Sequence, residues 1–345
     1  METIEFPNLF SGEIQIDRAA FSVFGFNIYW YAIIIAAGIF LAVLYCSKRG
    51  KKYGVTGDEV FDVALYGGIA GFVGARAYYC IFWNLNPANE EKFTFWSALT
   101  EIHKGGLAIY GGIIAGVIVG VLVCKVKKAP ILPMMDVGGT GFLIGQAIGR
   151  WGNFVNQEAF GAPTAGDLPW GMTGSVIARY PEVIAAQEEL GTSGYALVHP
   201  CFLYESLWCG LGIILIHFVL SRIQTFDGEL FLYYVIWYGA GRGLIEGLRT
   251  DSLYIGPLRV SQLLGFASAA FCLILLFYFK GKVKKDAGYQ LQRDTEERKR
   301  RIAEYELNIK LEKETQKAYK ALKKAGKAEE IAPSIFGDEE RNKKD

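Results

Sequence analysis

The sequence has 345 residues, of which 52% are hydrophobic and 41 are glycines. The formal net charge of +1 hides an uneven distribution, because residues 281–345 hold half of the lysines and arginines. This composition excludes an ordinary soluble domain and predicts a membrane body, residues 26–280, followed by a charged tail, since glycine is common in membrane helices. We expect no nucleic-acid partner.

The cysteines predict neither a zinc site nor a disulfide framework, because they form no CxxC pair and nearly all fall in apolar runs. They are Cys46, Cys80, Cys124, Cys201, Cys209 and Cys272. No metal or cofactor is expected. Residues 1–25 are acidic and lack a basic n-region, so we expect no cleaved signal peptide, and the first apolar segment must direct insertion.

The fold class predicted is an all-α polytopic membrane protein with about seven transmembrane helices. A helix of about 20 residues crosses about 30 Å of hydrocarbon. The predicted spans, in chain order, are residues 26–46, 60–83, 104–124, 134–148, 199–220, 230–248 and 258–279. The first begins with an aromatic group that includes Tyr31, as expected at a membrane interface.

Basic residues predict the orientation of these spans. They follow the first, third, fifth and seventh spans, at 48–52, 125–128, 222 and 280–285. Positive charge favours the cytoplasmic side. We therefore expect residues 1–25 outside, a small extracytoplasmic head at about 150–199 with one short helix near 183–190, and a cytoplasmic tail, residues 281–345, that is helical or disordered.

Arg76 lies inside the second predicted span. An arginine at that depth is expensive and should face the bundle interior or extend outward to the interface. A functional role and a purely structural pairing are both open for this residue.

The stretch GRWGNFVNQEAFG, residues 149–161, is the main polar signal. It places Arg150, Asn153, Asn156 and Glu158 where the fourth span should end. Polar side chains at the edge of the hydrocarbon are costly without partners or a polar ligand. Any one of them could belong to a solvated helix end, but together they favour a site, and an arginine fork suits phosphate.

A second polar signal lies on the sixth predicted span. Tyr238, Arg242, Glu246 and Arg249 follow one another at intervals of three or four residues and so share a helix face. A structural Arg242–Glu246 pair would explain part of this stripe, but not the second arginine and the tyrosine.

By the predicted topology, both polar signals lie toward the outer leaflet. Arg150 and Arg242 could then face one cavity that suits an anionic phospholipid headgroup. The sequence shows no Ser-His-Asp set, metal cluster or P-loop. A reaction at this site would take its nucleophile from a second substrate, while the arginines stabilise a departing phosphate.

The 149–161 stretch resembles the signature G-R-x-G-N-F-x-N-x-E-x-x-G of the prolipoprotein diacylglyceryl transferases, and every fixed position is present. Supporting matches are WYA at 30–32, GGLAIYGG at 105–112, HPCFLYE at 199–205 and RGLIEGLR at 242–249. The resemblance covers residues from about 20 to 280.

The resemblance implies a multi-pass enzyme of the bacterial cytoplasmic membrane. Such an enzyme moves the diacylglyceryl group of phosphatidylglycerol to the lipobox cysteine of a prolipoprotein, forms a thioether and releases glycerol phosphate. It implies that Arg150 and Arg242 act on the phosphate and that Glu246 orients Arg242. The residues expected to shape the site or contact the lipid are Asn153, Asn156, Glu158, Gly161, Tyr31, Tyr238 and His199.

The chain departs from many members of this family at Tyr110, where they carry histidine. A free thiol has a pKa near 8.5, so a group that removes its proton would help, and tyrosine, with a pKa of about 10, is a poor base. Tyr110 is a candidate catalytic residue by position. There are two alternatives to Tyr110 as the base: Glu158 could take the proton, or the arginines could lower the pKa of the thiol. His103 is expected to be a solvated loop residue.

Two other functional classes are open on the residues alone. A lipid or anion transporter could use the same paired arginines, but would be favoured by inverted repeats, which the halves of the chain do not show. A membrane scaffold would depend on the charged tail and would tolerate Arg150→Ala.

Overall fold

The computed structural model describes residues 1–87, 89, 91–101, 105–164, 166, 168–191 and 196–324. The chain divides into two compact units, Met1–Arg293 and Asp294–Asp345. The described part of the second unit is mainly one long helix, α10 (Glu296–Lys324), rich in Glu, Lys and Arg. The first unit contains every residue discussed below.

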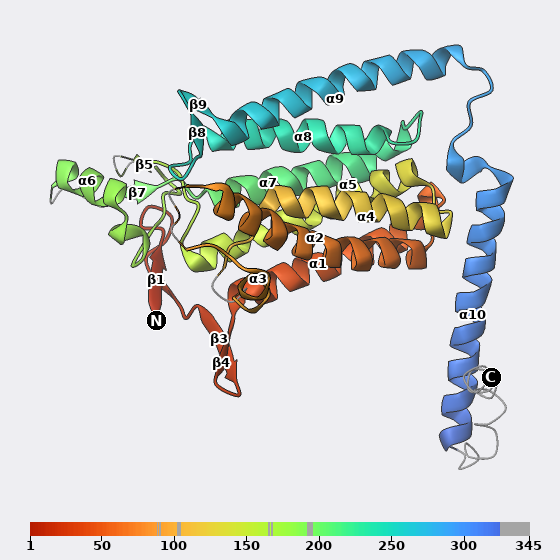
Figure 1. Cartoon of the computed structure of the whole chain (residues 1–345), viewed down its shortest axis with the longest axis horizontal. Coiled ribbons are helices and arrows are strands. Elements are labelled where there is room, and N and C mark those ends of the chain that lie inside the picture. Colours follow the sequence, from red (N-terminus) through yellow and green to blue (C-terminus); the bar gives the residue numbers. More distant parts are fainter. Residues whose placement is uncertain are drawn as a thin grey trace. The chain divides into compact units, whose positions relative to one another are not determined.

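Long helices lie side by side in the first unit (Figure 1). Their bounds are α1 (Trp30–Arg49), α2 (Gly57–Leu85), α4 (Ile109–Lys127), α5 (Ile131–Asn156), α7 (Cys201–Ile214), α8 (Glu229–Glu246) and α9 (Val260–Lys285). Within the described ranges, six helices are long and apolar enough to cross a membrane. The chain is therefore a multi-pass membrane protein. α8 is not among the six. It has only 18 residues, and three of them, Glu229, Arg242 and Glu246, are charged, which is too many for an apolar span of that length.

Several predicted span boundaries are wrong. The third helix starts at Ile109 rather than at residue 104, and the seventh starts at Val260, after strand β9 (Leu258–Arg259). The first helix does not begin at Phe26, because residues Phe26–Tyr29 form strand β4 and the helix starts at Trp30. The fourth span does not end at Ile148, because α5 continues to Asn156. Its last two turns therefore carry Arg150, Asn153 and Asn156 on a rigid helix rather than in a loop.

Short strands accompany the helices, so the expectation of a purely helical protein is too simple. They gather at one end of the bundle together with α6 (Pro181–Leu190), the predicted short helix (Figure 1). The bounds of the strands are β1 (Glu2–Glu5), β2 (Glu13–Ile16), β3 (Ala19–Val23), β4 (Phe26–Tyr29), β5 (Pro163–Thr164), β6 (Thr173–Gly174), β7 (Leu197–Val198), β8 (Tyr254–Ile255) and β9 (Leu258–Arg259). The remaining short helices are α3 (Phe95–Thr100), η1 (Gly50–Tyr53), η3 (Ile177–Arg179), η4 (Leu215–Val219), η5 (Leu220–Arg222) and η6 (Gln292–Asp294).

All strand pairs are antiparallel, and the largest sheet has the order β2-β1-β6. This sheet joins the N-terminal segment to the head, because Ile4 of β1 is opposite Gly174 of β6. Ile4, Ile177 and Val198 are fully buried in one small core at this end. The head is therefore a packed extension of the bundle that covers the end of α5.

Glycines let α2 and α4 approach closely. A Cβ atom added at Gly74 would lie 2.7 Å from the carbonyl oxygen of Gly111, closer than such atoms can stand. Small residues at helix interfaces allow this kind of packing in membranes.

Arg76 on α2 has structural partners. Its guanidinium donates to the carbonyl oxygens of Ala98 at 2.8 Å and Gly105 at 2.7 Å, and lies 4.9 Å from the centre of the Phe93 ring. These contacts favour the structural interpretation, in which Arg76 binds backbone carbonyl groups of the segment between α2 and α4 and holds them in place.

Candidate active site

The polar residues of the 149–161 stretch are held by the last turns of α5 and by the turn after it. Arg150 Nη1 donates to Asn153 Oδ1 at 3.2 Å, one helical turn away. The helix ends at Gln157, which adopts the left-handed conformation with φ of 52° and is fully buried. Its side-chain oxygen accepts from the backbone N–H of Val176 at 3.0 Å, so the head fixes the point where the chain turns back.

Glu158 organises both asparagines. Its Oε1 atom accepts from Asn153 Nδ2 at 3.0 Å and from Asn156 Nδ2 at 3.2 Å. Its other carboxylate oxygen has no hydrogen bond to the described residues. One oxygen of Glu158 thus orients the amides, and the other is available to a ligand or a proton.

Glu205 on α7 lies between the two predicted arginines. Its Oε2 atom pairs with Arg150 Nε, and its Oε1 atom accepts from Arg242 Nη1 at 2.7 Å. The Glu205 side chain is 4% exposed, while those of Arg150 and Arg242 are 20% and 19% exposed. The structure therefore brings Arg150 and Arg242 together, as predicted, through a carboxylate that was not among the predicted site residues.

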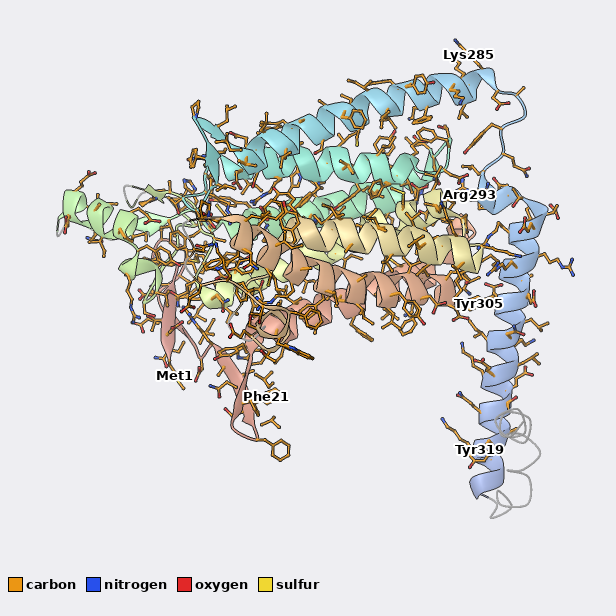
Figure 2. The ribbon with its side chains drawn as sticks, viewed as in Figure 1. Met1, Phe21, Lys285, Arg293, Tyr305 and Tyr319 are labelled. Atoms are coloured by element: carbon orange, nitrogen blue, oxygen red, sulfur yellow. The ribbon has the colours of Figure 1, made fainter. Side chains whose placement is uncertain are left out.

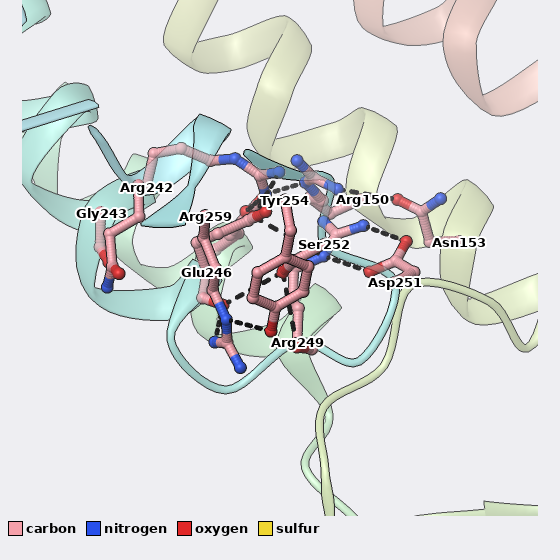
Figure 3. A network of polar contacts seen from close by, with 12 residues as sticks. Arg150, Asn153, Arg242, Gly243, Glu246, Arg249, Asp251, Ser252, Tyr254 and Arg259 are labelled. Atoms are coloured by element: carbon pink, nitrogen blue, oxygen red, sulfur yellow. Dashed lines mark hydrogen bonds and ion pairs between the residues drawn. The ribbon is translucent and has the colours of Figure 1, made fainter. Parts of the chain in front are cut away.

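The polar stripe on α8 continues this network (Figure 3). Arg242 Nη2 lies 2.6 Å from Glu246 Oε2, so the i,i+4 ion pair that the spacing allows is formed. Arg249 Nε is 4.0 Å from the same oxygen. Arg259 Nη1 donates to the Glu246 carbonyl oxygen at 2.5 Å. Carboxylates and arginines therefore alternate from α5 across α7 to α8.

The arginines keep donors beyond these pairs. A guanidinium offers five N–H donors in a planar fork that matches phosphate. Arg150 uses Nε and Nη1 on protein partners, which leaves Nη2, and Arg242 uses Nη1 and Nη2, which leaves Nε. The network can therefore accept a phosphate oxygen without losing the carboxylates that hold it.

Arg249 and Asp251 form a pair just beyond α8. Arg249 donates from Nε to Oδ1 at 2.9 Å and from Nη2 to Oδ2 at 2.7 Å. Burial alone would raise the pKa of Asp251, but the hydrogen bonds and positive charge of Arg249 outweigh it and hold that pKa below its usual value.

We expect the Asp251 carboxylate to stabilise the fold above its unfolded-state pKa of about 4, and this contribution to disappear as the pH falls through the lower folded-state pKa. Asp251→Asn should therefore lower the midpoint of thermal unfolding at pH 7, and the difference from wild type should shrink toward pH 3. A constant difference from pH 7 to pH 3 would contradict the assignment to ionisation of Asp251.

Gly161 closes the site against two other segments. Its N–H donates to the carbonyl oxygen of His199 at 2.9 Å, and the next N–H, of Ala162, donates to Leu248 at 2.7 Å. A Cβ atom at Gly161 would lie 2.7 Å from the His199 Cβ and 3.0 Å from the Leu248 oxygen. A side chain here would separate the signature from the ends of α7 and α8.

Gly161→Ala should therefore destabilise the protein by about 1–3 kcal/mol, the usual cost of overpacking. The matched control is Gly138→Ala on α5, where an added Cβ meets nothing within 4 Å. Alanine favours a helix more than glycine does, so the control should unfold at an equal or higher temperature. Equal effects of the two substitutions would contradict this account of Gly161.

His199 precedes α7 and contacts Tyr204. Its Nδ1 atom lies 3.1 Å from the Tyr204 hydroxyl, which accepts from Trp170 Nε1 at 2.6 Å. Burial lowers the pKa of His199, so the imidazole is neutral near pH 7. His199 thus packs beside Gly161 and joins the site to the head.

The two predicted lipid-contacting tyrosines lie near the network. The ring of Tyr31 packs on Gly152, where an added Cβ would come within 2.7 Å of it. Tyr238 is on α8, one turn before Arg242, and its ring stacks on Tyr234 with centroids 6.0 Å apart. Their hydrogen bonding to a lipid stays a prediction.

Tyr110 is not joined to this network. It lies in the first turn of α4 with 43% of its surface exposed, and within the described parts of the chain no hydrogen bond links it to Arg150, Glu158 or Glu205. His103 lies outside the described residues. Over the described ranges, no group of three or more His, Cys, Asp or Glu residues could hold a metal ion.

Comparisons with known proteins agree with the resemblance seen in the signature. The family model "Prolipoprotein diacylglyceryl transferase" matches residues 18–278. A protein of Finegoldia magna named phosphatidylglycerol–prolipoprotein diacylglyceryl transferase is 40% identical over 271 residues, which are 78% of this chain and 98% of that protein. A protein of the same name from Bacillus cereus strain B4264 is 37% identical over 276 residues, which are 80% and 96% of the two chains.

Proposed function

Because the chain belongs to the prolipoprotein diacylglyceryl transferase family, we propose that it transfers the diacylglyceryl group of phosphatidylglycerol to the lipobox cysteine of a prolipoprotein. The relatives carry both substrates in their name. The observation that carries the proposal is the pair Arg150 and Arg242, held on one buried carboxylate, Glu205.

In this reaction the cysteine sulfur attacks the glycerol carbon bonded to the phosphate oxygen. A carbon–sulfur bond forms, the carbon–oxygen bond breaks, and its electron pair leaves with glycerol phosphate. Arg150 and Arg242 would stabilise that developing charge with their remaining N–H donors. The acyl chains stay on the transferred group, so the product is bound to the membrane by its new lipid.

The carboxylates would act by positioning the arginines. Glu205 fixes Arg150 relative to Arg242, and Glu246 holds the second amino group of Arg242 at 2.6 Å. A fixed guanidinium loses little conformational freedom when charge develops beside it, which is the basis of electrostatic preorganisation. Asn153 and Asn156, oriented by Glu158, would bind the glycerol headgroup.

The thiol proton needs an acceptor, and Glu158 is the better placed of the two candidates. Its free carboxylate oxygen lies in the signature, whereas Tyr110 is exposed and outside the network. A role of Tyr110 in substrate contact or in proton transfer stays a prediction.

Glu158→Gln should lower turnover at pH 7 by about 10²-fold or more, because glutamine keeps an oxygen for both asparagines but cannot take up a proton. The measurement is the rate of peptide lipidation at pH 7. Turnover by Glu158→Gln within about tenfold of wild type would show that Glu158 has only a structural role.

Several features support a location in the bacterial cytoplasmic membrane with α8 as the seventh span. The bundle has its strands and Met1 at one end and Lys285 at the other, where α1, α4 and α9 finish in basic residues (Figure 2). Positive charge favours the cytoplasm, so the candidate site and the head would face outward.

The test uses purified protein in detergent with phosphatidylglycerol and a lipobox peptide that has one cysteine. Glycerol phosphate should appear only when both substrates are present, and in proportion to peptide consumed. A peptide with serine for cysteine should give none. The same protein reconstituted in vesicles tests the alternative: phosphatidylglycerol that crosses the vesicle membrane without release of glycerol phosphate would favour a transporter and contradict the proposal.

A further inference from the structure

Three segments that are distant in sequence meet at the end of the bundle opposite the candidate active site. The first segment is the end of α1 together with η1. The second is the stretch of η4 and η5 after α7. The third is the segment that follows α9 and ends at Arg293. Lys52 Nζ donates to Ser221 Oγ at 3.2 Å, and an added Cβ at Gly54 would lie 3.0 Å from the Arg293 Cα. Five of the basic side chains in these segments are here called the basic cluster: Arg49, Lys52, His217, Arg222 and Arg293.

The members of the basic cluster repel one another. These like charges are the guanidinium groups of Arg49, Arg222 and Arg293, which all act on the Lys52 ammonium. Over the described ranges no carboxylate forms an ion pair with Arg49, Lys52 or Arg222. The Arg49 Nε atom is buried without a hydrogen-bond partner. A cluster of cations of this kind is stabilised by a bound anion.

Two buried carboxylates, Asp136 and Asp227, accept hydrogen bonds from neutral donors. Asp136 accepts from Gln224 Nε2 at 2.8 Å and from the N–H groups of Gly228 at 2.7 Å and Phe231 at 2.9 Å. Asp227 accepts from the N–H of Gln292 at 2.9 Å. These acids fix the loop before α8 and the segment after α9, and they form no ion pair with Arg49, Lys52 or Arg222.

A π-helical turn shapes the site. η4 (Leu215–Val219) is a π-helix that interrupts the last part of the fifth apolar segment. Its His217 Nδ1 atom lies 2.6 Å from the Tyr45 hydroxyl of α1, and its carbonyl oxygen accepts from Ser221 Oγ at 2.6 Å. Such turns are rare and occur frequently at functional sites.

Apolar side chains lie beside the basic cluster. Phe218, Val219 and Ile223 are 54%, 50% and 55% exposed, and Leu44 of α1 is 37% exposed. A ligand with a phosphate and acyl chains would satisfy both surfaces at once, whereas a soluble anion would use only the cations.

We propose that the basic cluster binds the phosphate of an anionic phospholipid from the leaflet at this end of the bundle, at a site separate from the active site. Basic pockets between membrane helices on the cytoplasmic side bind anionic headgroups in this way. The lipid would join η1 to the π-helical turn and hold the ends of α1 and α7 together. The proposal does not depend on the reaction proposed above.

The test measures binding of dioleoyl phosphatidic acid to the full-length protein by native mass spectrometry. The variant is Lys52→Ala/Arg222→Ala, and the control is Lys125→Ala/Lys284→Ala, which removes the same charge from exposed lysines of α4 and α9. The apparent Kd should rise about tenfold or more in the variant and stay within twofold in the control. Circular dichroism checks that both variants are folded.

Two outcomes would overturn the proposal. Equal binding by wild type, variant and control would show that the lipid binds elsewhere, including at the arginine pair of the active site. Competition by inorganic phosphate at the same concentration as the lipid would show that the cluster takes a soluble anion and that the acyl chains contribute nothing.

Discussion

Arg150→Ala and Arg242→Ala should each lower the rate of peptide lipidation by about 10²–10³-fold, the usual cost of removing one donor to developing negative charge. Both arginines approach Glu205 from different helices, Arg150 from α5 and Arg242 from α8. Neither can replace the other, because each is fixed by its own second partner, Asn153 for Arg150 and Glu246 for Arg242. The effect should appear mainly in kcat, since the charge on the leaving phosphate develops in the transition state.

The matched control is Arg179→Ala. Arg179 is an exposed arginine of the head, in η3, with no side-chain hydrogen bond to the described residues. It should retain wild-type turnover. Normal turnover by Arg150→Ala in a preparation that inserts and folds would remove Arg150 from the mechanism.

Glu205→Gln should reduce both activity and stability. The carboxylate is almost fully buried and is shared by two arginines, so its loss leaves two partly buried cations without a common partner. Removal of one member of a buried ion pair costs about 3–5 kcal/mol. Turnover should fall at least about tenfold, because the arginines are no longer held at a fixed separation.

The measurement compares the thermal unfolding midpoint with kcat and KM for phosphatidylglycerol. Glu189→Gln, an exposed carboxylate on α6, is the control and should match wild type in all three. A Glu205→Gln protein with a normal midpoint and normal kcat would mean that the arginines are positioned by other contacts.

The sequence predicted the helical membrane body because long apolar runs with aromatic starts and basic ends leave few alternatives. It predicted the end of α5 less well. Polar residues such as Arg150 and Asn153 look like a loop when read in order, yet α5 continues to Asn156 because the head and Glu158 satisfy those side chains. Tertiary contacts of this kind have no local signature.

Sequence reasoning did not include Glu205, the carboxylate that pairs with both Arg150 and Arg242, among the candidate site residues. The signal was present, because a glutamate one turn into an apolar helix is costly unless it is paired. The partners, however, come from two other helices, and the spacing along α7 says nothing about them. The polar stripe on α8 was easier to predict from the sequence, since Arg242 and Glu246 are four residues apart on one helix.

The central claim is that this chain forms a thioether between a diacylglyceryl group and a cysteine. The most direct measurement is the mass of a single-cysteine lipobox peptide after incubation with phosphatidylglycerol and purified protein. We expect an increase in mass equal to one diacylglyceryl group on the cysteine with wild type, and none with Arg150→Ala. An unmodified peptide from folded wild-type protein would contradict the claim.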